Sequence, residues 1–236
     1  MNDLIMNKKK LVVLTGAGIS AESGIRTFRD GNGLWEDYNI EDVATPHAWK
    51  RDPGLVLRFY NQRRKDVLKA VPNSAHFGIA ALEQLFQVTV ITQNIDDLHE
   101  RAGSTNVLHL HGEILKMRCE TDDRKLYDIR EDIHLGDHSE NGYQLRPHVV
   151  WFEEPVPMIG KAIPEMKSAD LFILVGSSLA VYPAAGLLAY LPDDIPKFIV
   201  DKSIPPVHSY SNIIPIEKPA TEGIAAIRNL LEKGQY

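Results

Sequence analysis

The chain has 236 residues, of which 44% are hydrophobic and 25% are charged, enough for one sizeable α/β core and a small additional module. Its formal net charge of -6 argues against nonspecific binding of nucleic acid, which needs a basic face. No apolar run of about 20 residues predicts a membrane span, and no apolar signal segment follows the first lysines, so we expect a cytoplasmic protein. The single cysteine, Cys119, excludes an intramolecular disulfide and any site built from several cysteines.

The first predicted element is a buried strand at residues 11–15 that runs into a glycine turn. Gly16, Gly18 and Ala21 match the pattern G-x-G-x-x-G/A, in which small residues allow a tight turn and a close approach of the backbone to a dinucleotide pyrophosphate. Alone, this pattern also fits a packing turn in any α/β protein. Residues 23–35 are polar and rich in glycine, so we expect a long ordered loop over the cofactor in place of an immediate second strand.

Short apolar runs closed by polar or glycine residues predict five further strands, at residues 88–92, 107–110, 171–176, 197–200 and 213–216. Helices are expected between them at residues 74–86 and 221–233. The expected apolar face of the first helix consists of Phe77, Ala81, Leu82 and Leu85. This alternation predicts an α/β fold with a Rossmann-like, doubly wound parallel sheet.

Two segments interrupt the alternation: residues 36–71 have a helical pattern, and residues 116–145 are polar and rich in charge. No Pro/Gly/Ser-rich linker separates a second domain. We therefore expect a single domain over residues 1–236, in which these two insertions form a smaller discontinuous module. The large lobe would then comprise residues 1–35, 72–115 and 146–236. No large apolar exposed stripe argues for obligate assembly, so a monomer is expected.

Two of the predicted strands end in the motifs TQNIDDLH, at residues 92–99, and LHGE, at residues 110–113. Strand ends are where open α/β sheets bind ligands. Together with the glycine turn and with residues 145–152 and 175–178, these motifs resemble the sirtuin family of NAD-dependent protein lysine deacylases. The resemblance covers nearly the whole chain, and five motifs in order are far more specific than one glycine turn.

The resemblance implies that NAD is the cofactor and that acylated lysine side chains of proteins are the substrates. In that family the acyl oxygen attacks C1′ of the nicotinamide ribose, nicotinamide leaves, and the acyl group ends on ADP-ribose. A general base must deprotonate a ribose hydroxyl, and the residue that matches it is His111. Gln93, Asn94 and Asp96 match positions that hold the ribose and the carboxamide. The implied catalytic residues are thus His111, Asn94 and Asp96. Strand-end capping would also explain Gln93, Asn94 and Asp96, and a histidine whose hydrogen bonds are satisfied at a strand end would also explain His111.

The resemblance also assigns the rest of the cofactor site. Phe28 and Arg29 match a loop that shields the reactive intermediate from water, and Ser177 matches a turn on the adenosine side. The implied cofactor-binding residues are Gly16, Ala17, Gly18, Ser20, Phe28, Arg29, Gln93, Asn94, Ile95, Asp96, Gly176, Ser177, Ser178, Asp201 and Ala220.

Tyr60 and Arg63 are three residues apart in a helical segment and would share a face. With a small Ala44, they resemble the sirtuin subgroup that removes succinyl, malonyl and glutaryl groups, in which the pair clamps the terminal carboxylate. Such a contact contributes about 1.5 to 3 kcal/mol and would favour succinyl over acetyl by roughly tenfold to a hundredfold. Alternatively, residues 63–65 form a solvated basic face. The implied substrate-binding residues are Ala44, Tyr60, Arg63, Val149, Trp151, Phe152 and Glu153.

The chain departs from the family at three places. Most sirtuins hold zinc with two cysteine pairs, but Cys119 is the only cysteine, so no zinc is expected. Glu153 stands where glycine is usual, beside the segment that pairs with the substrate peptide. Asp201 stands where an asparagine commonly contacts the adenosine ribose. A helix that brought His134 and His138 to one face would allow a substitute metal site, which would consist of Cys119, His134, Asp137 and His138. We expect these residues to be solvated instead.

Two alternative functions remain open. NAD-dependent mono-ADP-ribosyl transfer shares the cleavage of nicotinamide and differs only in the nucleophile that captures C1′. A noncatalytic sensor of NAD or ADP-ribose would need no general base, so His111 argues against it. A dehydrogenase is disfavoured because the strand with the ribose-binding acid is missing.

Overall fold

The computed structural model describes residues 8–26, 34–35 and 38–235. Its main element is a six-stranded sheet. Its strand order is β11-β10-β9-β1-β4-β5, and every neighbouring pair is parallel. The strands are β1 (Lys10–Thr15), β4 (Gln87–Thr92), β5 (Val107–His109), β9 (Leu171–Val175), β10 (Lys197–Asp201) and β11 (Ile213–Glu217). The predicted Rossmann-like α/β fold is confirmed.

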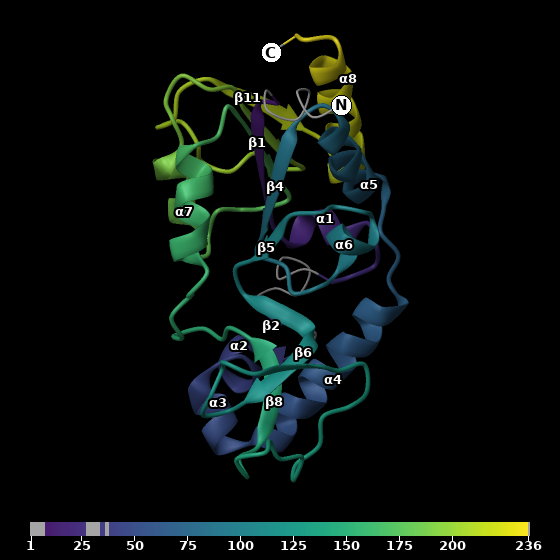
Figure 1. Ribbon diagram of the computed structural model, residues 1–236, viewed down its shortest axis with the longest axis vertical. Helices are drawn as coiled ribbons and strands as arrows, with labels where there is room; N and C mark the ends of the chain where they lie inside the picture. The colour runs from purple at the N-terminus through teal and green to yellow at the C-terminus, as the bar shows by residue number, and fades with distance from the viewer. Residues whose placement is uncertain (1–7, 27–33, 36–37, 236) are drawn as a thin grey trace.

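Both faces of this sheet are covered. Leu11 and Val13 of β1 belong to one core, and Val12 and Leu14 belong to another, because successive side chains of a strand point to opposite faces. Helices α5 (Ser74–Ala81) and α8 (Ala220–Glu232) pack on the first face, and α7 (Ile159–Lys167) with the 3-10 helix η2 (Ala184–Tyr190) packs on the second. Figure 1 shows α7 on one side of the sheet and α5 and α8 on the other. Burial on two faces explains why the strands are continuous apolar runs.

The helix expected at residues 74–86 is shorter, and its predicted apolar face is only partly correct: Leu82 is buried in the core, whereas Leu85 is 45% exposed. The α-helix ends at Ala81, and the 3-10 turn η1 (Leu82–Gln84) follows it. Phe77 is 50% exposed. The helix instead turns Gly78 toward α8, where a Cβ on that glycine would lie 2.6 Å from Cγ2 of Ile224. Close packing between these two helices therefore decides which side of α5 is buried.

A second, smaller part of the structure lies below the six-stranded sheet in Figure 1. It contains α2 (Ile40–Val43), α3 (Pro46–Arg51), α4 (Pro53–Lys69) and an antiparallel sheet of β6 (Gly112–Cys119), β7 (Leu126–Asp128) and β8 (Leu145–Val149). These elements share their own hydrophobic core. The boundaries expected after residues 115 and 145 fall inside β6 and at the start of β8. The separate core supports the predicted two-part division, which we retain as a proposal.

The segment after β1 begins with the short helix α1 (Ala17–Ala21). Residues 27–33, which include most of the loop expected over the cofactor, lie outside the described residues. Beyond them, β2 (Leu34–Trp35) pairs with β3 (Tyr38–Asn39) in an antiparallel ribbon, where no strand was expected. Two-residue strands carry no detectable alternation in sequence, which is why the pattern missed this one.

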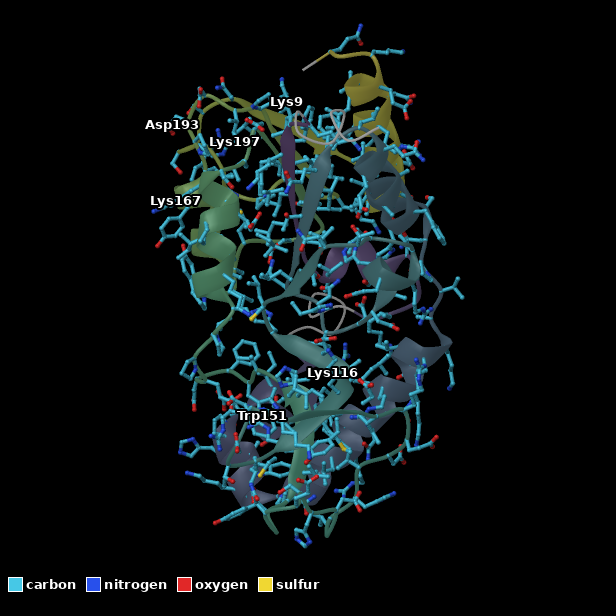
Figure 2. All side chains as sticks on the ribbon, in the orientation of Figure 1. Lys9, Lys116, Trp151, Lys167, Asp193 and Lys197 are labelled. Atoms are coloured by element: carbon cyan, nitrogen blue, oxygen red, sulfur yellow. The ribbon has the colours of Figure 1, made fainter. Side chains whose placement is uncertain are left out.

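A buried lysine at the start of β10, Lys197, has hydrogen-bond partners for its ammonium group. Lys197 is 2% exposed, and its ammonium donates to the carbonyl oxygens of Asp193 and Ile195 at 3.1 Å each. Figure 2 places Lys197 and Asp193 at the end of the molecule far from Trp151, which lies in the smaller part.

Among the described residues, no helix combines the length and the apolar character that crossing a bilayer requires.

Candidate functional site

The residues that follow β1, β4, β5, β9 and β10 meet at one cavity of about 610 Å³. Its lining contains every predicted site residue except Phe28 and Arg29, which lie outside the described residues. The predicted residues that line it are Gly16, Ala17, Gly18, Ser20, Ala44, Tyr60, Arg63, Gln93, Asn94, Ile95, Asp96, His111, Val149, Trp151, Phe152, Glu153, Gly176, Ser177, Ser178, Asp201 and Ala220. The topology thus brings together residues that are up to 204 positions apart, from 16 to 220.

The glycine turn packs directly against the end of β9. The backbone N–H of Gly16 donates to Val175 O at 3.0 Å, and that of Gly18 donates to Gly176 O at 2.9 Å. A Cβ on Gly16 would lie 2.7 Å from Gly176 O, and one on Gly18 would lie 2.6 Å from Gly176 Cα. These two glycines therefore also serve as a packing turn, and their N–H groups are engaged within the protein. Any side chain larger than hydrogen would push the two strand ends apart and distort the cavity wall.

The turn after β4 is held by side chains from two other elements. Gln93 Nε2 donates to Ser177 Oγ at 3.0 Å. Asn94 Nδ2 donates to Ser20 Oγ at 3.1 Å, and that hydroxyl donates to Asp96 Oδ2 at 3.0 Å. Burial raises the pKa of Asp96, while the hydrogen bond from Ser20 acts in the opposite direction. This network orders three predicted site residues before any ligand binds.

His111 lies at the edge of the same turn. Its Nδ1 is 2.9 Å from Gln93 O, and because a carbonyl oxygen only accepts, Nδ1 carries the proton in this contact. Burial lowers the pKa of His111, although the hydrogen bond to Gln93 partly opposes this. Gly112 follows at φ 80°, and a Cβ there would lie 2.2 Å from His148 O. The neutral imidazole therefore keeps Nε2 as a proton acceptor. The backbone conformation and the close packing at the next residue, position 112, require glycine.

Another part of the cavity wall is organised by an ion pair that the sequence did not reveal, between the buried Arg146 and the partly buried Glu154. Arg146 donates from Nη1 and Nη2 to the two carboxylate oxygens of Glu154, at 2.8 and 3.1 Å, and from Nη2 to Val149 O at 2.9 Å. Glu154 also accepts from the backbone N–H of Trp151 at 2.8 Å, and the guanidinium carbon lies 3.2 Å from the Trp151 ring centroid. The only sequence signal was that an arginine precedes the Trp-Phe pair and a glutamate follows it, eight residues after the arginine.

The cavity wall also includes Phe152, whose backbone N–H donates to Ala44 O at 3.0 Å. This bond joins the segment after β8 to the segment after α2. Both segments contribute predicted substrate-binding residues to the cavity.

Tyr60 and Arg63 lie on α4 and are both buried, at 1% and 6% exposure. Arg64 is 1% exposed and donates to the carbonyl oxygens of Ile114 and Glu131 at 2.9 and 3.2 Å. The alternative of a solvated basic face is therefore wrong for both arginines. Burial raises the pKa of Tyr60, so its phenol stays protonated and able to donate.

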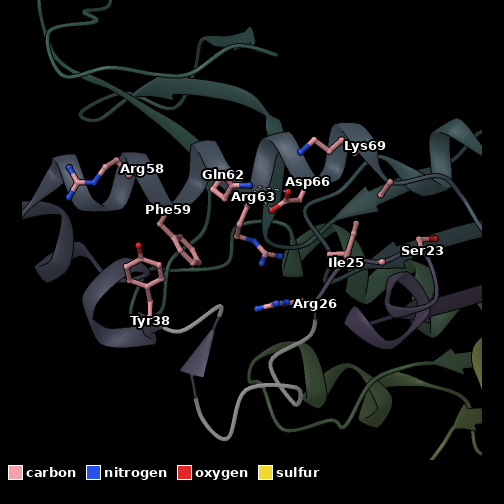
Figure 3. Close-up of a pocket in the computed structure, with 12 residues that line it drawn as sticks. Ser23, Ile25, Arg26, Tyr38, Arg58, Phe59, Gln62, Arg63, Asp66 and Lys69 are labelled. Atoms are coloured by element: carbon pink, nitrogen blue, oxygen red, sulfur yellow. Dashed lines mark hydrogen bonds between the residues drawn. The ribbon is translucent and has the colours of Figure 1, made fainter.

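A second cavity of about 730 Å³ adjoins the first beside α4, and Ile25, Arg26 and Arg63 line both. Figure 3 shows Arg63 projecting from α4 into a space that Arg26 enters from the other side. Arg26 was not predicted to be a site residue, and its position directly after the glycine-turn segment was the available signal. Two guanidinium groups thus border the junction of the two cavities and favour an anionic group there.

Lys202 and Lys218 also line the first cavity, which contains His111, and they were not predicted. Each follows the carboxyl end of a strand, β10 or β11. Strand-end position alone could have identified them, because this is the edge where parallel sheets bind ligands.

Glu153 adopts a backbone conformation that favours glycine, with φ 72°. Its side chain is 63% exposed, and its carboxylate lies 3.5 Å from Nδ1 of His47, which is 87% exposed. An ion pair so exposed contributes little to stability. The cost of the left-handed backbone is therefore not offset by this contact.

We expect the substitution Glu153→Gly to raise the free energy of unfolding by about 0.5 to 1 kcal/mol. Glycine removes the steric cost of the positive φ, and this gain exceeds the loss that comes from the greater entropy of glycine in the unfolded chain. The melting temperature should rise by roughly 1 to 4 °C. The control Glu153→Ala removes the carboxylate but keeps Cβ, so it should not stabilise the protein. Equal stabilisation by both variants in a thermal melt would show that the carboxylate, rather than the backbone, is unfavourable.

The residues near Cys119 do not fit the zinc site of most sirtuins. Cys119 is the only cysteine in the chain, and its sulfur contacts the hydroxyl groups of Thr121 and Ser139 at 3.3 and 3.4 Å. Residues 133–138 form no helix that would bring His134 and His138 to one face. Within the described ranges, no group of three or more His, Cys, Asp or Glu side chains could hold a metal ion.

Comparison with known proteins identifies the family. The sequence profile of the Sir2 family matches residues 16–183. The chain belongs to the Sir2 family. This Sir2 family member is 48% identical over 229 residues to the NAD-dependent protein deacylase of Bacteroides thetaiotaomicron, covering 94% of this chain and 98% of that protein. It is 48% identical over 225 residues to that of Helicobacter pylori strain 26695, covering 95% and 97%. It also matches the crystal structure of a Sir2 homolog–NAD complex with a TM-score of 0.86 at 35% identity, over 100% of this chain and 96% of the other.

Proposed function

We propose that this Sir2 family member removes acyl groups from lysine side chains of proteins in an NAD-dependent reaction. The observation that carries the proposal is the position of His111, a partly buried neutral imidazole whose Nδ1–H is engaged by Gln93 O and whose Nε2 can accept a proton. It lines the cavity together with the glycine turn and with Asn94 and Asp96. The names of the relatives and the Sir2 homolog–NAD complex support the same activity.

When bound, NAD supplies a ribose carbon that releases nicotinamide and accepts the acyl oxygen. Gln93, Asn94 and Asp96 would orient the ribose and the carboxamide, because their hydrogen bonds to the hydroxyl groups of Ser177 and Ser20 fix their side chains in the cavity. His111 would take a proton from a ribose hydroxyl at Nε2. Trp151 and Phe152, whose segment is held by Arg146 and Glu154, would flank the lysine side chain and exclude water.

The direct test is to incubate the protein with NAD and with peptides that contain acetyl-lysine, succinyl-lysine or unmodified lysine. Mass spectrometry then follows nicotinamide, deacylated peptide and acylated ADP-ribose. Stoichiometric formation of all three supports the proposal. Nicotinamide release without loss of the acyl group would indicate ADP-ribosyl transfer, and NAD binding without turnover would indicate a sensor.

We further propose that the preferred acyl groups are succinyl and malonyl, with glutaryl as a third candidate and weaker activity on acetyl. Ala44, Tyr60 and Arg63 line the same cavity as His111. A neutral phenol and a buried guanidinium on one helix face suit a carboxylate, which accepts from both. Arg26 at the cavity junction adds a second positive charge at this end.

The variant Arg63→Met should lower kcat/KM for a succinyl-lysine peptide by roughly tenfold to a hundredfold, because a charge-assisted hydrogen bond is lost. Activity on the matched acetyl-lysine peptide should stay the same or rise. Arg63→Lys keeps the charge but not the planar fork and should give an intermediate loss. Lys65→Met removes a half-exposed cation from the same helix and serves as a control. Undiminished succinyl turnover in Arg63→Met would refute the clamp.

We also propose that the protein functions without the structural zinc of most sirtuins, as a cytoplasmic monomer. Its smaller part has its own apolar core, which supports stability without metal. Treatment with a zinc chelator should leave the melting temperature and the deacylase rate unchanged, and elemental analysis should find well below one zinc per chain. Stoichiometric zinc, or unfolding on chelation, would contradict this proposal.

A further inference from the structure

Two histidines hold the turn after β4 from the neighbouring strand end. His111 Nδ1 is 2.9 Å from Gln93 O, and His109 Nδ1 is 3.0 Å from Asn94 O. The second ring nitrogen of His109 is 2.7 Å from Glu100 Oε1, on the short helix α6 (Leu98–Arg101). His109 is 8% exposed and does not line the cavity. It can therefore act on a ligand only through the residues that it holds.

The partners of His109 determine its protonation. A backbone carbonyl and an ionised carboxylate can only accept hydrogen bonds, so both ring nitrogens of His109 must donate. The ring is then an imidazolium. Burial by itself lowers the pKa of His109, but the hydrogen bond and charge of Glu100, together with the hydrogen bond to Asn94 and the charge of Glu113, outweigh burial, and the net shift is upward. The pKa of Glu100 is shifted downward, because its contacts with His109 outweigh burial.

The charged and titratable groups around His109 come from three elements. Glu100 and His99 belong to α6, Asp96 belongs to the turn after β4, and Glu113 belongs to β6. The three carboxylates favour the cation, and His99 is itself kept neutral by burial. A neutral histidine could place its single proton on either nitrogen, whereas an imidazolium always carries one at Nδ1.

We propose that His109 is a positioning residue of the cofactor site, held by Glu100 as an imidazolium whose Nδ1–H fixes Asn94 O and with it the turn that carries Asn94 and Asp96. The proposal rests on the proposed function, since it assigns this turn to NAD. The ion pair of His109 with Glu100 excludes the neutral tautomer that has its proton only on Nε2, in which the lone pair of Nδ1 would face Asn94 O. The turn is thus anchored by two imidazoles, one for catalysis and one for position.

Two amide variants separate positioning from general stability. In His109→Asn the amide nitrogen occupies the place of Nδ1 and still reaches Asn94 O, whereas in His109→Gln it occupies the place of Nε2 and reaches Glu100. Each variant is neutral and keeps one of the two donors. Calorimetry with NAD alone should give a Kd within about threefold of wild type for His109→Asn and roughly tenfold weaker for His109→Gln. Urea unfolding of both variants should show similar losses of stability.

The result that overturns the proposal is equal weakening of NAD binding in the two variants, or no weakening in either. A histidine that only stabilises the fold would change NAD affinity in step with urea stability. Because NAD binding is measured without acylated peptide, a protein that binds NAD normally but does not deacylate would refute the proposed function alone.

A second measurement does not depend on variants at position 109. Nitrogen NMR of labelled histidine should show both nitrogens of His109 protonated at a pH above 6.5, the ordinary pKa of histidine. Glu100→Gln should move that titration to lower pH, because the neutral amide no longer favours the cation. A singly protonated His109 in the wild-type protein at pH 6.5, or a titration unchanged by Glu100→Gln, would contradict the imidazolium.

Discussion

Replacing His111 with asparagine is expected to lower the turnover of acylated peptide by roughly 10²-fold to 10⁴-fold, the usual loss for a general base. The asparagine amide can still donate to Gln93 O in place of Nδ1, but it offers no counterpart of Nε2. The fold and NAD affinity should therefore be retained. Single-turnover measurements by mass spectrometry give the rate, and calorimetry gives the Kd for NAD as the control.

The pH dependence provides an independent check on the same residue. A general base must be neutral, so kcat/KM should rise with pH through the pKa of His111 and level off above it. Burial lowers this pKa below the ordinary 6.5 of histidine, so the midpoint of the acidic limb should lie below pH 6.5. His111→Asn should lose that limb. Undiminished turnover in the variant, or a wild-type midpoint well above 6.5, would contradict the assignment.

The second large effect concerns stability. Arg146→Met should lower the free energy of unfolding by about 3 kcal/mol, the lower end of the range for breaking a buried ion pair, because the carboxylate of Glu154 that is left behind is only partly buried. Arg146 and Glu154 side chains are 5% and 18% exposed. Arg118 lies 3.8 Å from Glu154 and compensates only in part. The variant should also loosen Val149 and Trp151, so that KM for the peptide rises more than KM for NAD.

The double variant Arg146→Met/Glu154→Gln tests the cause of that loss. It removes both charges, while the glutamine oxygen can still accept from the Trp151 N–H. We expect urea unfolding to show that the double variant is more stable than Arg146→Met alone. If the two variants are equally unstable, packing on the Trp151 ring, rather than the unpaired carboxylate, accounts for the loss.

Residues at the carboxyl ends of the predicted strands were found because their positions follow from local patterns. Apolar runs such as 171–176 are buried wherever they occur, and small residues mark sharp turns. His111 and Asn94 then had to meet at one edge of a parallel sheet. The predicted apolar face of the helix at residues 74–86 failed at Phe77 and Leu85, because the buried side depended on Gly78 packing against a helix about 145 residues later.

The sequence by itself determined the fold class, the family and the identity of many, but not all, of the residues in the cavity. These follow from short-range signals: strand periodicity, glycine at positions that tolerate no Cβ, and motifs of fixed spacing. Only the tertiary structure decided which polar groups are partners, such as Arg146 with Glu154 and His109 with Glu100. A buried charge must find its partner wherever packing brings one within about 3 Å, and spacing along the chain carries no record of that distance.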